Sequence, residues 1–142
     1  MNTNQIQAFI NKAKDAPIQG YEGDEAKAKS AWLRAGRCIL KDLAKELHLE
    51  DGTYEIRINP AGPAVSGDVH LHGEWIYVDL SQTFLGPDMG FMWRYCDGKR
   101  DYSGRANQWA KWEELLDLLR FACKIRRFMP MDIQEKIAKE NT

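Results

Sequence analysis

Cysteine is scarce in this sequence, and its spacing excludes two kinds of small scaffold. The 142 residues include three cysteines, Cys38, Cys96 and Cys123, which are odd in number and far apart. A disulfide framework needs paired cysteines, and a structural zinc site needs closely spaced ligand pairs. We therefore expect reduced thiols, as in a cytoplasmic protein, in a chain long enough to bury a core without metal or disulfide support.

Long apolar runs are also missing. The first ten residues are rich in Asn and Gln, unlike the basic and then apolar start of a signal peptide. No uninterrupted apolar stretch approaches the roughly 20 residues that cross a bilayer. These absences predict a cytoplasmic protein with no membrane partner.

The chain lacks a strong excess of either charge, since its formal net charge is −1. An acidic DNA mimic or a general polyanion binder would need a field of one sign over the whole domain. The balance is nevertheless uneven. Residues 91–130 hold nine Lys and Arg against five Asp and Glu, whereas residues 1–90 hold nine against thirteen. This basic segment predicts a local anionic partner.

No catalytic signature is recognisable. Ser66, Ser81 and Ser103 lie in no nucleophile elbow, and the sequence around Cys96 and Cys123 identifies no base. The glycines of the basic segment form neither a phosphate loop nor a dinucleotide fingerprint. We therefore expect a non-enzymatic protein that uses no cofactor.

The sequence does contain clear helical periodicities. Apolar residues recur at helical spacing over residues 3–15, from Asp24 to about Leu47, over roughly 108–127 and more briefly over 132–139. Thr3, Asp24 and Asn107 are the side chains that we expect to cap the first three of these helices.

Between the second and third helices the apolar period changes to two, which is typical of half-buried strands. Strands are expected over residues 54–58, 65–72, 75–79 and 91–96, with a turn over 59–63. The order of elements predicts one α+β domain, residues 1–142, with a small antiparallel β-meander of three to four strands and helices packed on one face.

Gly73 and Glu74 fit a two-residue hairpin loop in which Gly73 takes the positive-φ position of a type II′ turn. This register would place His72 opposite Trp75 and would pair apolar with apolar residues throughout. Ionisable and aromatic side chains would then occupy the open face of the sheet, while the core face would carry Val69, Leu71, Ile76 and Val78.

The open face and the basic loop that follows it form the predicted contact surface. On the sheet, Trp75 and Tyr77 would supply aromatic anchors, and Arg94 would lie near Tyr77 or Asp79. If Asn107 opens a helix, free backbone amides there would add to the attraction for phosphate or for a carboxylate-rich protein surface. The densest group of donors lies in residues 97–109, namely Lys99, Arg100, Tyr102, Arg105 and Asn107.

Two other uses of this region remain open. His70 and His72 share one face of their strand, and Asp68 and Asp79 could flank them, so a metal-assisted phosphoester or nucleotide enzyme is one alternative. We nevertheless expect no tightly held metal ion, because no third histidine is nearby. The other alternative is a regulator that binds nucleic acid through the basic loop and the final long helix, with Arg120, Lys124, Arg126 and Arg127.

The segment Arg94–Asn107, RYCDGKRDYSGRAN, which follows an alternating hairpin, resembles small uncharacterised proteins encoded by phages and other bacterial mobile elements. The resemblance covers about the middle of the chain and brings no known catalytic residues. Such accessory proteins often modulate host defence or nucleic-acid machinery by binding, as anti-CRISPR proteins do. The resemblance therefore implies a non-enzymatic interaction protein of mobile-element origin that binds a host protein or nucleoprotein complex and inhibits a defence system such as CRISPR-Cas.

Overall fold

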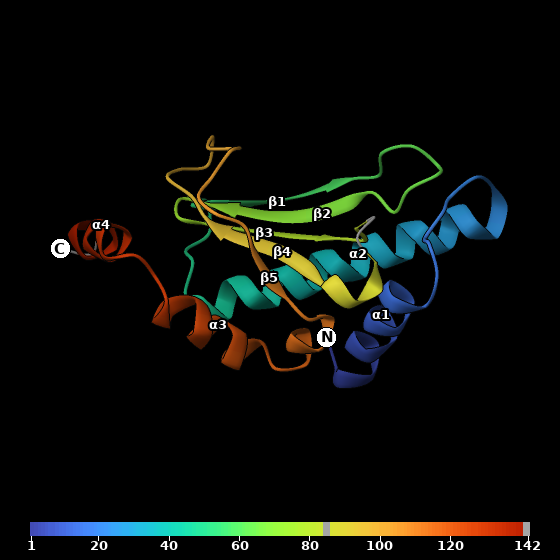
Figure 1. Cartoon of the computed structure of the whole chain (residues 1–142), viewed down its shortest axis with the longest axis horizontal. Coiled ribbons are helices and arrows are strands. Elements are labelled where there is room, and N and C mark those ends of the chain that lie inside the picture. Colours follow the sequence, from blue (N-terminus) through green and yellow to red (C-terminus); the bar gives the residue numbers. More distant parts are fainter. Residues whose placement is uncertain (84–85, 141–142) are drawn as a thin grey trace.

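The computed structural model describes residues 1–83 and 86–140, and within them four α-helices and a five-stranded antiparallel sheet form two layers (Figure 1). The helices are α1 (Thr3–Asp15), α2 (Gly23–Glu46), α3 (Leu118–Arg127) and α4 (Met131–Glu140). The strands are β1 (Tyr54–Asn59), β2 (Asp68–Gly73), β3 (Ile76–Ser81), β4 (Phe91–Tyr95) and β5 (Gln108–Ala110). Two 3₁₀ turns, η1 (Pro87–Met89) and η2 (Trp112–Leu116), precede β4 and α3.

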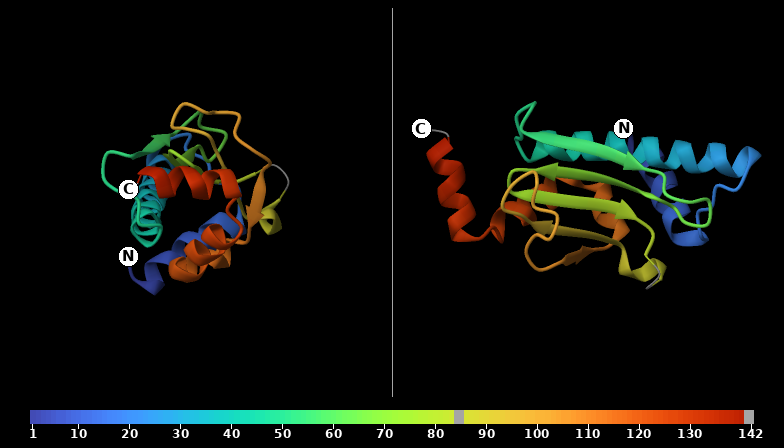
Figure 2. Two further views of the ribbon diagram at one scale, coloured as in Figure 1. Left: turned by 90° about the vertical axis from the view of Figure 1, so that its left-hand side faces the viewer. Right: turned by 90° about the horizontal axis from the view of Figure 1, so that it is seen from above.

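The sheet is an antiparallel meander in the order β1-β2-β3-β4-β5. The α+β class is therefore confirmed, but the prediction of three to four strands is wrong, because β5 adds a fifth strand to the described sheet. Figure 1 shows α1, α2 and α3 beneath one face of the sheet, and Figure 2 shows α4 standing beyond its end. No helix within the described residues is long and apolar enough to span a membrane.

The core lies between the sheet and the helices, and one set of alternating strand residues supplies half of it. An aromatic cluster joins the helices below this face: Phe9 of α1 stacks on Trp32 of α2 at 4.6 Å between ring centroids. Trp112 of η2 meets both rings edge-on. Seven of the strand residues that face this core are no more than 3% exposed, namely Val69, Leu71, Ile76, Val78, Leu80, Phe91 and Trp93.

The prediction of a helix over residues 108–127 is wrong for its first ten residues, because α3 begins at Leu118. Residues 108–110 pair with β4 instead, because an extended segment here occupies the edge of β4 that would otherwise expose unpaired backbone groups. The helix begins at Leu118, where the Asp117 carboxylate accepts a hydrogen bond from the backbone N–H of Arg120 at 3.0 Å. Asn107 is therefore not a helix cap.

The first two helices have the predicted extents to within one residue, but their capping residues differ. Asn2, not Thr3, caps α1, and it forms a reciprocal capping box with Gln5. The α2 helix begins at Gly23, and the preceding Glu22 makes no side-chain capping bond, so Asp24 lies inside the first turn. An acidic residue there still favours the helix through its dipole.

The predicted register of the β2–β3 hairpin is wrong by two residues. His72 lies opposite Tyr77, and His70 lies opposite Asp79. Gly73 is not among the residues with positive φ, so the type II′ turn is absent from this described hairpin. A shift by two leaves every side chain on its original face, because the pleat has a period of two. The pattern of apolar residues therefore could not distinguish the two registers.

The longer hairpin connection changes the position of Trp75. Its ring belongs to the core, with 8% of the residue exposed, and its carbonyl accepts a hydrogen bond from the backbone N–H of Cys96 at 3.0 Å. Trp75 is thus no anchor on the open face, contrary to its predicted position there. The strand expected from residue 65 begins at Asp68, and Val65 lies before it with 53% of its surface exposed.

Candidate functional site

Strand pairing arranges the side chains of the open sheet face into two rows. The first row, which we call the Arg94 row, crosses β1 to β4 and comprises Glu55, His72, Tyr77 and Arg94. The second row, the Asp79 row, crosses all five strands and comprises Arg57, His70, Asp79, Met92 and Trp109. Residues 97–107, which we call the basic loop, rise over this face at one end of the sheet (Figure 1).

The basic loop covers His72, so this imidazole is buried on a polar face. The Nε2–H of His72 donates to the Gly98 carbonyl at 3.0 Å, and the Tyr102 ring meets the imidazole edge-on at 5.4 Å. Only 4% of His72 is exposed. Burial lowers the pKa of His72 because it disfavours the charged form. His72 therefore supports the loop as a neutral hydrogen-bond donor.

Arg94 holds the loop from the sheet side. Its guanidinium carbon lies 4.5 Å above the centroid of the Tyr77 ring, which confirms the predicted proximity. Its Nη2 donates to the Tyr102 carbonyl at 2.7 Å, and its Nη1 reaches the Asn107 side-chain oxygen at 3.4 Å. Gly104 passes close to Arg94 with φ +61°, where a Cβ would collide with the Arg94 side chain. Arg94 is therefore an internal support of the loop.

Arg105, another predicted contact residue of this region, is paired with carboxylates. Arg105 donates to Asp97 at 2.5 Å and to both oxygens of Asp132, at 2.7 and 3.0 Å. Because Asp132 lies in the first turn of α4, this bridge ties the basic loop to that helix. Arg105 thus carries little uncompensated charge.

The acidic residue at the centre of the loop organises its backbone. Asp101 accepts hydrogen bonds from the backbone N–H groups of Gly104, at 2.8 Å, and Asp97, at 2.9 Å, and from the Ser103 hydroxyl. These bonds lower the pKa of Asp101 to about 2, because they stabilise the carboxylate. Lys99 adds a longer bond, 3.3 Å, to the Gly52 carbonyl. The loop is therefore preorganised by its own polar groups.

Three side chains point outward from this framework. Tyr102 is 65% exposed although its ring rests on His72, and Trp109 beside the loop is 38% exposed. Arg100 is exposed and makes no ion pair or hydrogen bond with any described residue. Sequence reasoning missed Trp109 as an open-face residue, because its spacing from Trp112 also fits a helical stripe.

Asp79, in the Asp79 row, lies beside a second carboxyl group, that of Asp68 on the adjacent strand β2. Burial, and then the negative charge of Asp68, raise the pKa of Asp79 to about 8, so Asp79 is protonated at neutral pH. Burial alone would raise the pKa of Asp68, but its hydrogen bonds to His70 and Asp79 outweigh this effect and lower it. The His70 Nδ1 lies 2.9 Å from the Asp68 carboxylate. The two carboxyl groups therefore share one proton.

These side chains do not converge on a metal position. The Nε2 of His72 is held by the Gly98 carbonyl, whereas the Nδ1 of His70 is held by Asp68. Among residues 1–83 and 86–140 there is no group of three or more His, Cys, Asp or Glu side chains arranged to hold a metal ion. The geometry thus gives no support to metal-assisted chemistry on this strand.

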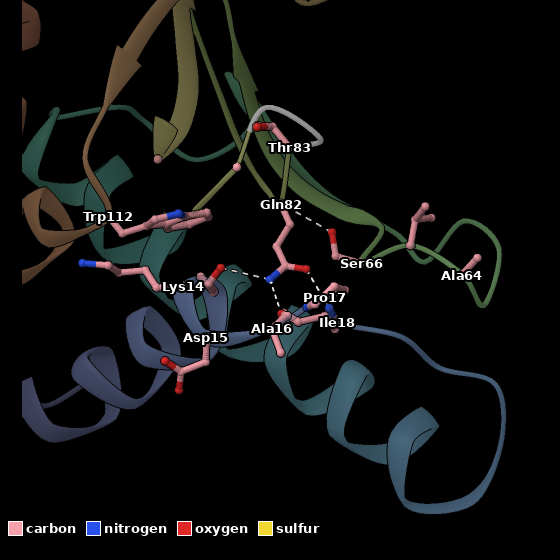
Figure 3. Close-up of a pocket in the computed structure, with 14 residues that line it drawn as sticks. Lys14, Asp15, Ala16, Pro17, Ile18, Ala64, Ser66, Gln82, Thr83 and Trp112 are labelled. Carbon is pink, nitrogen blue, oxygen red and sulfur yellow. Dashed lines mark hydrogen bonds between the residues drawn. The ribbon is translucent and has the colours of Figure 1, made fainter. Parts of the chain in front are cut away.

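A separate cavity of about 410 Å³ lies between the end of α1 and the ends of β2 and β3 (Figure 3). Gln82 fixes this junction: its Nε2 donates to the carbonyls of Ala13 and Ala16, and its Oε1 accepts from the backbone N–H of Ile18. The Ser66 hydroxyl in turn accepts from the backbone N–H of Gln82. Because these polar groups satisfy one another, we interpret the cavity as a structural junction.

No protein-family model, no curated protein and no solved structure matches this chain.

Proposed function

We propose that the protein acts by binding rather than by catalysis, and that the basic loop is its contact surface. Tyr102, Arg100 and Trp109 would contact the partner. The supporting observation is that Arg94 donates to the loop backbone and Arg105 pairs with carboxylates, while the Tyr102 side chain is held outward. A preorganised loop loses little conformational entropy on binding. Tyr, Trp and Arg are also the residues that dominate contact energies in interfaces.

The partner that this surface favours is a protein or the protein part of a nucleoprotein complex. A phosphate backbone is bound by several uncompensated cations at once. Here Arg105 is neutralised by Asp97 and Asp132, and Arg94 is bonded beneath the loop. The loop cations without an ionic partner among the described residues are Arg100 and Lys99, and Lys99 donates to the Gly52 carbonyl. A host defence complex such as CRISPR-Cas is the partner class that the resemblance of residues 94–107 to mobile-element proteins implies, and we propose it on that ground.

Affinity isolation from a bacterial host tests this proposal. Tagged full-length protein, the Arg100→Ala/Tyr102→Ala variant and an Arg34→Ala/Tyr21→Ala control would be compared, since Arg34 and Tyr21 are also exposed but lie far from the loop in the sequence. We expect wild type and the control to retain the same partner, and the loop variant to lose at least about tenfold in affinity for the purified partner. Equal retention by a correctly folded loop variant would exclude the loop as the contact surface.

A further inference from the structure

A groove of about 610 Å³ runs along the flank of α3 beside η2. It lies on the helical side of the molecule, whereas the basic loop rises from the opposite side of the sheet (Figure 1). Phe121, which is 1% exposed, belongs to the core below the groove, and Phe128, which is 62% exposed, lines the groove at the end of α3. The groove therefore presents a large aromatic surface at one end.

The carboxylates of this groove are already engaged. Glu113 pairs with Lys14 of α1, and Glu114 pairs with Lys124 at 3.1 Å. Asp117 accepts the capping hydrogen bond at the start of α3. Glu113 and Glu114 are therefore paired with cations, whereas Asp117 keeps an unpaired negative charge at the start of α3.

Two arginines of the groove are not engaged in this way. Arg120 and Arg127 form no ion pair within the described part of the chain, although Arg127 lies 5.7 Å from the centroid of the Phe128 ring. They are seven residues apart on one helix face, which places them two turns or about 10 Å apart along the axis. With Lys111 at the η2 end, the groove has three cations without an ion pair among the described residues, and Arg120 and Arg127 are the two that lie on α3.

We propose that the groove between η2 and α3 binds an acidic amphipathic helix of a partner protein. Its carboxylates, two helical turns apart, would pair with Arg120 and Arg127, and its apolar stripe would cover Phe128. Guanidinium groups bind carboxylates through paired hydrogen bonds, and an apolar helix face in a groove is a common mode of peptide recognition. This surface is independent of the basic loop, so it would be a second contact of the same protein.

A nucleic acid fits this groove less well than an acidic helix. Of the four cations predicted to bind it, Lys124 pairs with Glu114, and Arg126 donates to the Glu46 carbonyl at 2.6 Å. A phosphate backbone is charged at every nucleotide and would have to pass the groove's acidic side chains. A peptide can place its carboxylates only where the arginines lie.

The test uses a defined probe with the full chain. A fluorescein-labelled helical peptide of roughly 18 residues would carry a leucine stripe flanked by Glu at seven-residue spacing, and a second peptide would carry Lys in place of Glu. We expect saturable binding of the acidic peptide alone, seen by fluorescence anisotropy and by NMR shift changes in residues 111–128. Arg120→Ala/Arg127→Ala should weaken this binding at least about tenfold, as should Phe128→Ser.

The control is Arg34→Ala/Lys41→Ala, which removes two cations with the same seven-residue spacing from the exposed face of α2. This variant should bind the acidic peptide as wild type does. The proposal is overturned by the absence of saturable binding, by equal losses in the α2 control, or by shift changes outside the groove. Tighter binding of a single-stranded oligonucleotide that depends on Arg120 and Arg127 would assign the groove to nucleic acid. A dimer that Phe128→Ser dissociates would assign it to a second copy of the chain.

Discussion

The two faces of the sheet are built from the same strands, yet they are held together by different forces. Leu71 and Val78 form a fully buried apolar pair, and one residue away His70 and Asp79 form a polar pair on the open face. The apolar pair is stabilised by removal from water. The polar pair loses hydration, and hydrogen bonds offset that cost only in part.

The open face shows where this compensation is incomplete. Asp79 Oδ1 and Arg94 Nε are buried and have no hydrogen-bond partner among the described residues. On the covered face, Trp93 Nε1 is likewise unpartnered within the described residues. A buried polar atom without a partner costs about 1–3 kcal/mol. We therefore infer that the covered face supplies most of the stability, whereas the open face gives up some of it to hold the basic loop.

The largest expected difference in the free energy of unfolding is between alanine variants of two tryptophans that lie three residues apart. Trp112 is 2% exposed beneath the sheet, whereas Trp109 is 38% exposed on the open face. Trp112→Ala should lower the free energy of unfolding by about 3–5 kcal/mol, because it leaves a cavity among Phe9, Trp32 and Phe91. Trp109→Ala should lower it by about 1 kcal/mol or less.

Urea denaturation followed by far-ultraviolet circular dichroism measures both values without relying on tryptophan fluorescence. Similar losses for the two variants would show that the open face contributes as much to stability as the core, and the contrast between the faces would be wrong.

The second prediction concerns the shared proton of the open face. Asp79 keeps its proton up to about pH 8 in the folded protein, whereas in the unfolded chain it loses it near its ordinary pKa of 3.8. The folded state therefore binds more protons between these values, and stability falls as pH rises through this window, by up to about 1.4 kcal/mol per pH unit. The neutral side chain in Asp79→Asn can donate to Asp68 but cannot ionise, so this variant should lack the slope.

The sharpest test lies between pH 6.5 and 8. The pKa of His72 is lowered below its ordinary 6.5, so its contribution is complete above that value and is lost only as pH falls. In this interval Asp79→Asn should become progressively more stable than wild type in urea denaturation. Parallel stability curves for the two proteins would show that Asp79 is already ionised in the fold.

Much of the fold could be predicted from local patterns. The spacing of Ile6, Phe9, Ile10 and Ala13 predicts α1 with the observed bounds, because a single amphipathic stripe determines it. The strand faces were also predictable, since alternation directly reflects burial. The hairpin register was not, because a shift of two residues preserves that alternation. The β5 strand is only three residues long, too short to show a period of its own.

The candidate site could be predicted only where it depended on strand geometry. Alternation on neighbouring strands placed Arg94 on the open face near Tyr77 or Asp79, and in the structure it lies opposite Tyr77 and over its ring. The bridge from Arg105 to Asp132 spans 27 residues and depends on where α4 lies, which no local pattern indicates. The sequence therefore predicted that all the cations of the loop could contact a partner. In the structure, Arg100 and Tyr102 are the loop side chains that point outward.

The smallest effect on global stability is expected from two arginines at the loop, Arg94 of β4 beneath it and Arg100 within it, but their effects on loop opening should differ most clearly. Arg94→Ala removes the bond to the Tyr102 carbonyl and the contact with the Tyr77 ring, so the loop should open more often. Amide hydrogen exchange at Gly104 and Arg105, whose N–H groups bond to Asp101 and to the Tyr95 carbonyl, should accelerate at least about tenfold, or about 1.4 kcal/mol of local opening. Arg100→Ala should leave these rates unchanged, because Arg100 bonds to no described residue. Equal acceleration in both variants would show that Arg100 also holds the loop and is not free to contact a partner.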